Sequence, residues 1–204
     1  MAVIATDNFT GADASPIGGN WTTAGGSGAM RRVSNTIATV TAATESAAYW
    51  NANSFPNDQY SKYTETTVGT NGDQGAVVRC ATSGTQKNYY WASSFTLNPD
   101  NEGLNKFVNN NFTHILTQNV TNFVNGDIIG AEAQGTTIRF LKNNVVQGSV
   151  TDSSHASGAA GIFMFESDCR GDNWEGGDFT TAGEVVSDNY ATIVPRAEVR
   201  RWIW

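Results

Sequence analysis

The segment TIRFLKNNVV, residues 137–146, places two alternating apolar and polar runs on either side of the pair Asn143-Asn144. Asparagine tolerates the left-handed backbone conformation that a two-residue hairpin turn requires. Alternation with a period of two residues is typical of strands that bury one face. The segment therefore predicts a β-hairpin of residues 137–142 and 145–150, and similar alternating windows recur along the chain.

The overall composition favours strands and turns over helices. The 204 residues include four Leu and four Lys beside 24 Thr, 21 Gly and 21 Asn. Helices are rich in Leu and Lys, whereas Thr favours strands and Gly and Asn favour turns. We therefore expect an all-β fold, and the length suits one well-buried domain.

Short alternating windows separated by Gly, Asn, Asp and Ser give the expected strands. They cover residues 3–9, 29–33, 36–42, 47–51, 59–68, 75–81, 89–96, 112–118, 127–133, 137–142, 145–150, 160–166 and 178–180. Two irregular stretches, 11–28 and 167–177, are long for connections and rich in Gly, Asp and Asn. Connections of this length often carry function, so both are candidate sites.

The charge of the chain argues against several classes of protein. Twelve Lys and Arg against nineteen Asp and Glu give a net charge of −7, the wrong sign for binding nucleic acid. No apolar stretch has the length of a membrane span. Residues 1–7 lack a basic leader and an apolar signal region, so we expect no secretory route. Cys80 and Cys169 are expected to be thiols in or near the core, with a bridge between them left open.

The end of the chain differs from its body. Residues 195–204 carry three Arg and one Glu with two Trp, whereas the body is acidic. We therefore divide the chain into a domain of residues 1–188 and a basic, aromatic tail of residues 189–204. The tail is either a final strand of its own domain or a docking segment for another subunit. The residues expected to carry docking are Arg196, Arg200, Arg201, Trp202 and Trp204.

The order of several short motifs resembles one superfamily. The motifs are Asp7-Asn8-Phe9, Trp21, residues 55–60 (FPNDQY), 75–79 (GAVVR), 126–129 (GDII), 135–138 (GTTI), Asn143-Asn144, 158–162 (GAAGI) and 172–174 (DNW). Together they resemble the concanavalin A-like lectin and glucanase superfamily in its laminin-G-like branch. The resemblance implies a jelly-roll sandwich of two antiparallel sheets, often with a concave face that holds a glycan. Similar proteins in phage and microbial genomes serve on virions or as binding modules.

The acid pair of the superfamily's glucanases is absent. Those enzymes carry Glu-x-Asp-x-x-Glu on one strand, and the closest match, Glu166-Ser167-Asp168, has Gly171 at the last position. A glycosidase needs two such carboxyl groups. Glu65 and Glu132 stand alone on expected strands, and we expect both to face solvent. No lyase signature surrounds His114 or any other candidate base.

Aromatic side chains are the candidates for binding a glycan, because rings stack on the apolar face of a sugar. The expected ligand-binding residues are Trp50, Tyr90, Trp91, Asp172 and Trp174. Neighbours on a strand point to opposite faces, so at least one ring of each run should lie in the core. No cofactor is required, but the resemblance makes calcium a candidate, with Asp168, Asp172 and Asp178 as its ligands.

These observations favour a non-catalytic β-sandwich module on a phage virion, as a capsid decoration or tail component that binds surface glycans. Its partners would be other virion proteins or copies of itself, and it would occupy the virion surface or, before assembly, the host cytoplasm. The alternative is a free-standing lectin. A glycoside hydrolase or polysaccharide lyase ranks third.

Overall fold

The computed structural model describes residues 1–69, 73–95, 102–117 and 123–179, and every element in them is a strand. The strands are β1 (Ala2–Asp7), β2 (Trp21–Thr23), β3 (Met30–Val33), β4 (Thr36–Thr39), β5 (Ser46–Trp50), β6 (Gln59–Thr67), β7 (Asp73–Cys80), β8 (Tyr89–Phe95), β9 (Gly103–Val108), β10 (Asn111–Thr117), β11 (Ile128–Gln134), β12 (Thr137–Lys142), β13 (Val145–Thr151), β14 (Ala159–Met164) and β15 (Arg170–Asp178). Within these ranges no helix is long and apolar enough to cross a membrane.

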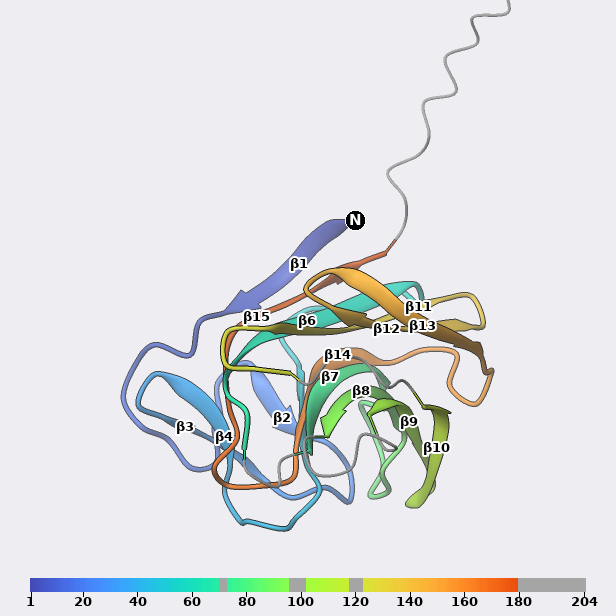
Figure 1. The fold of residues 1–204 in the computed structure, drawn as a ribbon. Helices are drawn as coiled ribbons and strands as arrows, with labels where there is room; N and C mark the ends of the chain where they lie inside the picture. The colour runs from blue at the N-terminus through green and yellow to red at the C-terminus, as the bar shows by residue number, and fades with distance from the viewer. Residues whose placement is uncertain (70–72, 96–101, 118–122, 180–204) are drawn as a thin grey trace, which may run out of the picture.

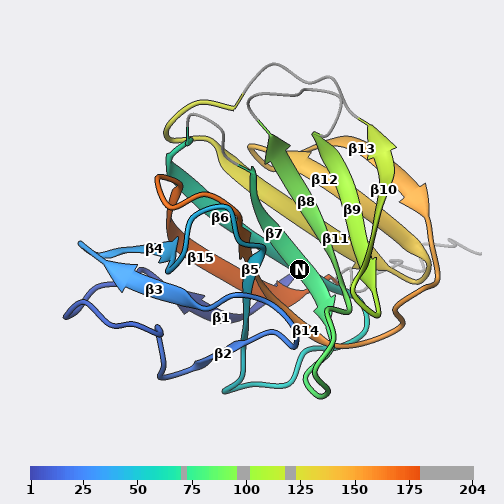
Figure 2. The ribbon, with the colours of Figure 1, turned by 90° about the horizontal axis from the view of Figure 1, so that it is seen from below.

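The strands form two antiparallel sheets that pack face to face as a jelly-roll sandwich. The eight-stranded sheet has the order β13-β12-β11-β6-β15-β4-β3, and β1 pairs with β15. The seven-stranded sheet has the order β10-β9-β8-β7-β14-β5-β2. In Figure 1, β6, β11 and β12 lie above β7, β8 and β9, and Figure 2 faces the seven-stranded sheet from below. The predicted fold class is therefore confirmed.

The β-hairpin predicted for residues 137–150 is present in the structure. Thr137↔Thr151 and Lys142↔Val145 are paired in β12 and β13. Asn143 and Asn144 have φ values of 52° and 63°, the left-handed conformation that the turn requires. Alternation with turn residues therefore predicts this part of the sheet correctly.

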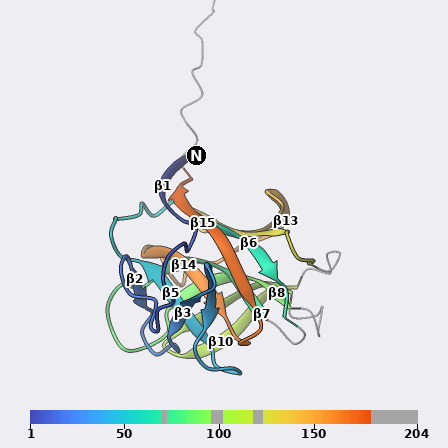
Figure 3. The same ribbon diagram turned by 90° about the vertical axis from the view of Figure 1, so that its left-hand side faces the viewer.

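Three strands were not predicted, namely β2, β9 and β15. β15 crosses a stretch that was expected to be a loop, and the expected strand at 178–180 shares only Asp178 with it. Its composition hides it, because Gly, Asp and Asn are depleted in strands. Nevertheless β15 pairs with β6, β4 and β1, and Figure 3 shows it beside β1.

The glycines of β15 are needed for close packing. A Cβ on Gly177 would meet the Ala2 carbonyl oxygen and the Tyr60 ring, and a Cβ on Gly171 would meet the Tyr63 ring. Only glycine lets these backbones and rings approach so closely. The glycines that made residues 170–178 resemble a loop therefore allow this segment to pack as a strand inside the sheet.

The core between the sheets ends in a cluster of indole rings. Trp174 stacks on Trp50 with ring centroids 5.4 Å apart and meets the edge of Trp21 at 4.7 Å. Its Nε1 donates to Ser61 Oγ at 2.9 Å, and Ser61 Oγ donates to the Gly161 carbonyl at 2.7 Å. Ser61 lies in the eight-stranded sheet and Gly161 in the other, so this chain of bonds ties the two layers together.

A second cluster lies on the outer face of the seven-stranded sheet. Tyr89 and Trp91 point outward, opposite to Tyr90, and yet both are at most 1% exposed. Residues 24–27 cover this face, because they lie against residues 84–86 and Ser27 Oγ bonds to Tyr89 OH at 3.2 Å. The alternation predicted within the run 89–91 is confirmed, but the outward rings are covered.

Both cysteines are free, buried thiols in different clusters. Cys80 belongs to the outer cluster, and Cys169 lies in the core between the sheets. The bridge that the sequence left open is therefore not formed. The tail of residues 189–204, with the docking residues predicted in it, lies outside the described residues.

Replacing Gly177 with Ala tests the close packing of β15. We expect the free energy of unfolding to fall by about 1–3 kcal/mol, because the new methyl group overpacks a closed site. Urea unfolding followed by circular dichroism measures this. Gly130→Ala is the matched control on β11, because its Cβ would make ordinary contacts of 3.4 Å and more. Equal effects of the two substitutions would contradict the packing argument.

Candidate functional site

A hollow of about 490 Å³ lies where three connections meet at one end of the sandwich. We call it the loop-end hollow. Its residues come from the end of β5 and the loop that follows, from the loop after β7, and from the start of β14. They are Tyr49, Trp50, Asn51, Ala52, Asn53, Ser54, Phe55, Thr82, Ser157, Gly158 and Ala159.

Aromatic rings form one side of the loop-end hollow and are fixed by hydrogen bonds. Trp50 Nε1 donates to Asn53 Oδ1 at 2.9 Å, and Tyr49 OH donates to the Thr82 carbonyl at 3.1 Å. Trp50 and Tyr49 are 7% and 8% exposed, whereas Phe55 is half-buried. The rings therefore present rigid edges and faces rather than mobile side chains.

Exposed polar side chains form the other side. Asn51, Asn53, Ser54, Thr82 and Ser157 all lie on the surface. Amide and hydroxyl groups both donate and accept hydrogen bonds, so together they match a ligand rich in hydroxyl groups. Apolar rings combined with a few convergent polar groups are the usual make-up of a small-ligand site.

A buried glutamine positions the loops that form the loop-end hollow. Gln59 is fully buried, and its Nε2 donates to the carbonyls of Pro56 and Gly158 at 2.8 and 2.9 Å. Its Oε1 accepts the Arg79 backbone N–H at 3.1 Å. One side chain thus joins three segments that are far apart in sequence.

Arg79 completes this support. It is 2% exposed and has a φ of 52°, which an L residue rarely adopts. Its guanidinium donates to the carbonyls of Asn57 and His155 at 2.9 and 3.0 Å and lies 3.6 Å from Asp58. Burial lowers the pKa of Arg79, and the nearby Asp58 carboxylate opposes that shift. Arg79 therefore serves to hold the two loops rather than to meet a ligand.

The loop-end hollow has the groups for binding but not for acid–base chemistry. Among the described residues that line it there is no Asp, Glu, His or Lys. Glycoside hydrolysis needs two carboxyl groups that flank the scissile bond. The arrangement can therefore orient a hydroxylated ligand, and its described lining lacks the carboxyl pair that glycoside hydrolysis requires.

Of the predicted ligand-binding aromatics, only Trp50 lies at this site. Tyr90 is fully buried between the sheets, and its OH donates to Asp152 at 2.6 Å. Trp91 and Trp174 are each 1% exposed within their clusters. Neighbouring rings pack against both, and neither lines the loop-end hollow, so a role of either ring in ligand binding stays a prediction.

The three predicted calcium ligands do not come together. Asp172 and Asp178 are six residues apart in β15, which places them about 20 Å apart at ~3.3 Å per residue. Asp172 Oδ1 instead accepts the Asn173 N–H at 2.7 Å. Within the described ranges no group of three acidic, His or Cys side chains could hold a metal. The shared calcium site expected at these aspartates is therefore corrected. Asp172 does not line the loop-end hollow, and its role in ligand binding stays a prediction.

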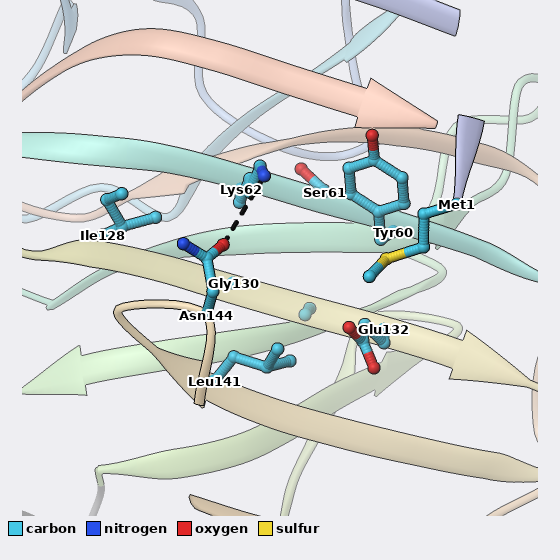
Figure 4. A pocket seen from close by; sticks show the side chains of 10 residues that line it. Met1, Tyr60, Ser61, Lys62, Ile128, Gly130, Glu132, Leu141 and Asn144 are labelled. Carbon is cyan, nitrogen blue, oxygen red and sulfur yellow. Dashed lines mark hydrogen bonds between the residues drawn. The ribbon is translucent and has the colours of Figure 1, made fainter. Parts of the chain in front are cut away.

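A smaller hollow lies on the outer face of the eight-stranded sheet. Figure 4 shows Lys62, Glu132 and Tyr60 around it, with Lys62 Nζ 3.5 Å from Asn144 Oδ1. Its volume is about 50 Å³, which is room for one or two waters. Glu132 is 6% exposed, so the expectation that it faces solvent is wrong, and burial raises its pKa while Arg139 opposes the rise.

Two carboxyl groups, one fully buried and one half-buried, lie toward the other end of the sandwich. Glu65, also expected to face solvent, is fully buried, accepts a hydrogen bond from Ser94 and has a pKa raised well above its usual range by burial. Asp73 accepts the Ser93 hydroxyl at 2.5 Å. Burial raises the pKa of Asp73 to about 7, against the opposing effect of that bond.

Sequence reasoning found the rings before the first loop but missed the remainder of the loop-end hollow. Thr82 and Ser157 are ordinary polar residues in turn-rich segments, and nothing in their neighbourhood marks them. They become neighbours of Trp50 only because Gln59 and Arg79 draw the three connections together.

Comparison with solved structures places the fold. No family model and no curated protein matches the chain. The carbohydrate binding module CBM66 from Bacillus subtilis is 18% identical, with a TM-score of 0.59, over 78% of this chain and 92% of that one. The Bacillus licheniformis β-glucanase is 11% identical, with a TM-score of 0.53, over 85% and 97%. The exoplasmic/lumenal domain of VIP36 in its Ca²⁺/Man3GlcNAc-bound form is 9% identical, with a TM-score of 0.51, over 83% and 88%.

These likenesses agree with the expected architecture. The chain has the galectin-like and concanavalin A-like jelly-roll fold of lectins and glucanases. The laminin-G-like branch within that superfamily stays a prediction.

Replacing Gln59 with Leu tests the support of the loop-end hollow. We expect the free energy of unfolding to fall by about 2–4 kcal/mol, because Leu leaves buried backbone groups without partners. Urea unfolding measures the loss. Gln147→Leu on β13 is the matched control, since Gln147 is partly exposed and its side chain donates to the carbonyl of Val145, two residues away. A loss at Gln59 no larger than at Gln147 would refute the supporting role.

The raised pKa of Asp73 predicts a dependence of stability on pH. The folded state holds this proton more tightly than the unfolded state, so its contribution is present below about pH 4 and is lost as pH rises to about 7. Asp73→Asn should therefore raise the melting temperature relative to the wild type at about pH 8 and less at about pH 5. Thermal unfolding at both pH values checks this, and a constant difference would contradict it.

Proposed function

We propose that this chain is a carbohydrate-binding module of the lectin type that takes a glycan in the loop-end hollow. The observation that carries the proposal is the combination of fixed rings with exposed amide and hydroxyl groups around one hollow of about 490 Å³. CBM66 is a carbohydrate binding module and the VIP36 structure holds a mannose-containing glycan, so two proteins of similar fold support the same class.

The proposal takes the lectin alternative rather than the virion role. None of the similar structures named above is a virion protein, whereas two of them are glycan-binding. The glucanase of similar fold raises the question of hydrolysis. The described lining of the loop-end hollow has no carboxyl pair, which favours binding without cleavage.

The binding geometry follows from the two sides of the loop-end hollow. The apolar face of a sugar ring would lie against Phe55 and the edges of Tyr49 and Trp50. This contact removes apolar surface of both partners from water, which is favourable. The hydroxyl groups would point to Asn51, Asn53 and Ser157. Because Trp50 and Asn53 are already bonded to each other, little side-chain entropy is lost on binding.

A glycan array followed by calorimetry with the best ligand tests the proposal. Ser54→Arg should abolish binding, because its long side chain fills the loop-end hollow from an exposed position. Ser149→Arg is the matched control on the edge strand β13, and it should bind like the wild type. Retained binding in Ser54→Arg, or release of reducing ends from the bound glycan, would overturn the proposal.

Metal removal gives an independent check. The VIP36 domain of similar fold was solved with Ca²⁺, but the described lining of the loop-end hollow has no carboxylate to hold such an ion. We therefore expect glycan affinity to be unchanged in EDTA. Calorimetry with and without chelator measures it, and a tenfold or greater loss would assign the ion a direct role.

A further inference from the structure

A third hollow, of about 240 Å³, lies on the outer face of the seven-stranded sheet, beyond the segment 24–27 that covers the middle of that face. We call it the aromatic hollow. It combines four aromatic rings with two carboxyl groups, and its lining is Glu45, Asp73, Trp91, Phe112, Phe163 and Phe165.

The rings of the aromatic hollow are held in place by one another. Trp91 stacks on Phe163 with centroids 4.8 Å apart and lies 5.8 Å from Phe112. Trp91 and Phe163 are each 1% exposed, whereas Phe112 is 53% exposed and is the one exposed aromatic ring among the described residues. Phe112 therefore leaves one ring accessible to a ligand beside a rigid aromatic floor.

The chemistry of this lining differs from that of the loop-end hollow. Apart from the two carboxyl groups, every lining side chain is aromatic. A sugar needs several hydrogen-bonding partners for its hydroxyl groups, and this lining supplies few. The faces of aromatic rings carry partial negative charge and attract cations, most strongly at Trp. A lining of aromatic rings and carboxylates therefore favours a cation whose charged nitrogen carries methyl groups.

The protein already places one ammonium group on the same aromatic cluster. Lys87 Nζ lies 4.8 Å above the centre of the Phe107 ring and forms an ion pair with Glu45. Phe107 in turn stacks on Trp91 with centroids 5.0 Å apart. The surroundings thus stabilise a cation on the ring of Phe107, and the aromatic hollow offers a second position beside the exposed ring of Phe112. The acidic balance of the chain, −7 overall, also favours cationic ligands.

We propose that the aromatic hollow binds an organic cation with a quaternary ammonium head, of which choline is the simplest probe. The methyl groups would contact Phe112 and Phe165, and the charge would be balanced by Asp73 together with Glu45, which also pairs with Lys87. This site is separate from the loop-end hollow and does not depend on the proposed glycan binding.

Calorimetry with choline chloride at constant ionic strength and about pH 8 is the primary test. The neutral isostere 3,3-dimethylbutan-1-ol has the same shape without the charge, so it separates cation binding from filling of an apolar hollow. We expect saturable binding of choline with a Kd on the order of 1 mM and at least tenfold weaker binding of the isostere. Equal binding of both, or no saturation by about 50 mM choline, would overturn the proposal.

Substitutions at Phe112 and Glu45 locate the site without threatening the fold, because both side chains are partly exposed. Phe112→Leu keeps apolar bulk but removes the aromatic face and should weaken choline binding about tenfold, whereas Phe112→Tyr should retain it. Glu45→Gln should weaken binding, and the matched control Asp13→Asn, an exposed loop position, should not. Equal affinity of Phe112→Leu and the wild type would refute this site even if choline binds elsewhere.

Glycans serve as the competing ligand in the same experiment. Glucose or a glycan that binds the loop-end hollow should leave choline affinity unchanged in wild-type protein. Competition, or loss of choline binding in Ser54→Arg, would mean that the two hollows form one site and would contradict the proposal of a separate cation site. Glycan binding can fail while choline binding holds, and the reverse, so the two proposals are tested apart.

Discussion

The hydrogen bond from Trp174 Nε1 to Ser61 Oγ is the contact on which the rest of the sandwich depends. Ser61 passes the contact on to the Gly161 carbonyl in the other sheet, while the Trp174 ring packs against Trp50 and Trp21. The Trp174 side chain thereby helps to join both sheets and holds the ring of Trp50, which lines the loop-end hollow. A buried indole needs such a polar partner, and here the partner also bridges the sheets.

Alternation and turn chemistry predicted most of the sandwich, because they report how each strand meets its neighbours. The hairpin at Asn143-Asn144 is the clearest case. β15 was not predicted because its glycines are required by close contacts with the rings of Tyr60 and Tyr63. Both rings belong to another strand that is far away in sequence. Local propensity describes a residue and its neighbours along the chain, so it fails where a strand is selected for close approach.

In the candidate site too, some features follow from neighbouring residues in the sequence, whereas others depend on residues from distant segments. Trp50 could be found from its place before a polar loop, but Trp91 could not be recognised as buried from the sequence. Its outward direction follows from the strand period, whereas its burial depends on the rings of Phe107 and Phe163, which come from other strands and stack on it. Exposure of an outward ring is thus set by residues from distant parts of the chain that pack around it. Phe112, on the edge strand β10, remains 53% exposed.

The covered middle of the seven-stranded sheet also decides how its two hollows relate. β5 and β14 run beneath both, with Tyr49 and Ala159 at the loop-end hollow and Phe163 at the aromatic hollow. Between them Ala47 and Val77 are fully buried, so no open groove joins the two sites. Coupling between sites requires an element with two arrangements that both ligands bias. Paired strands in a closed core offer one arrangement, so the two sites should act independently, with binding free energies that add.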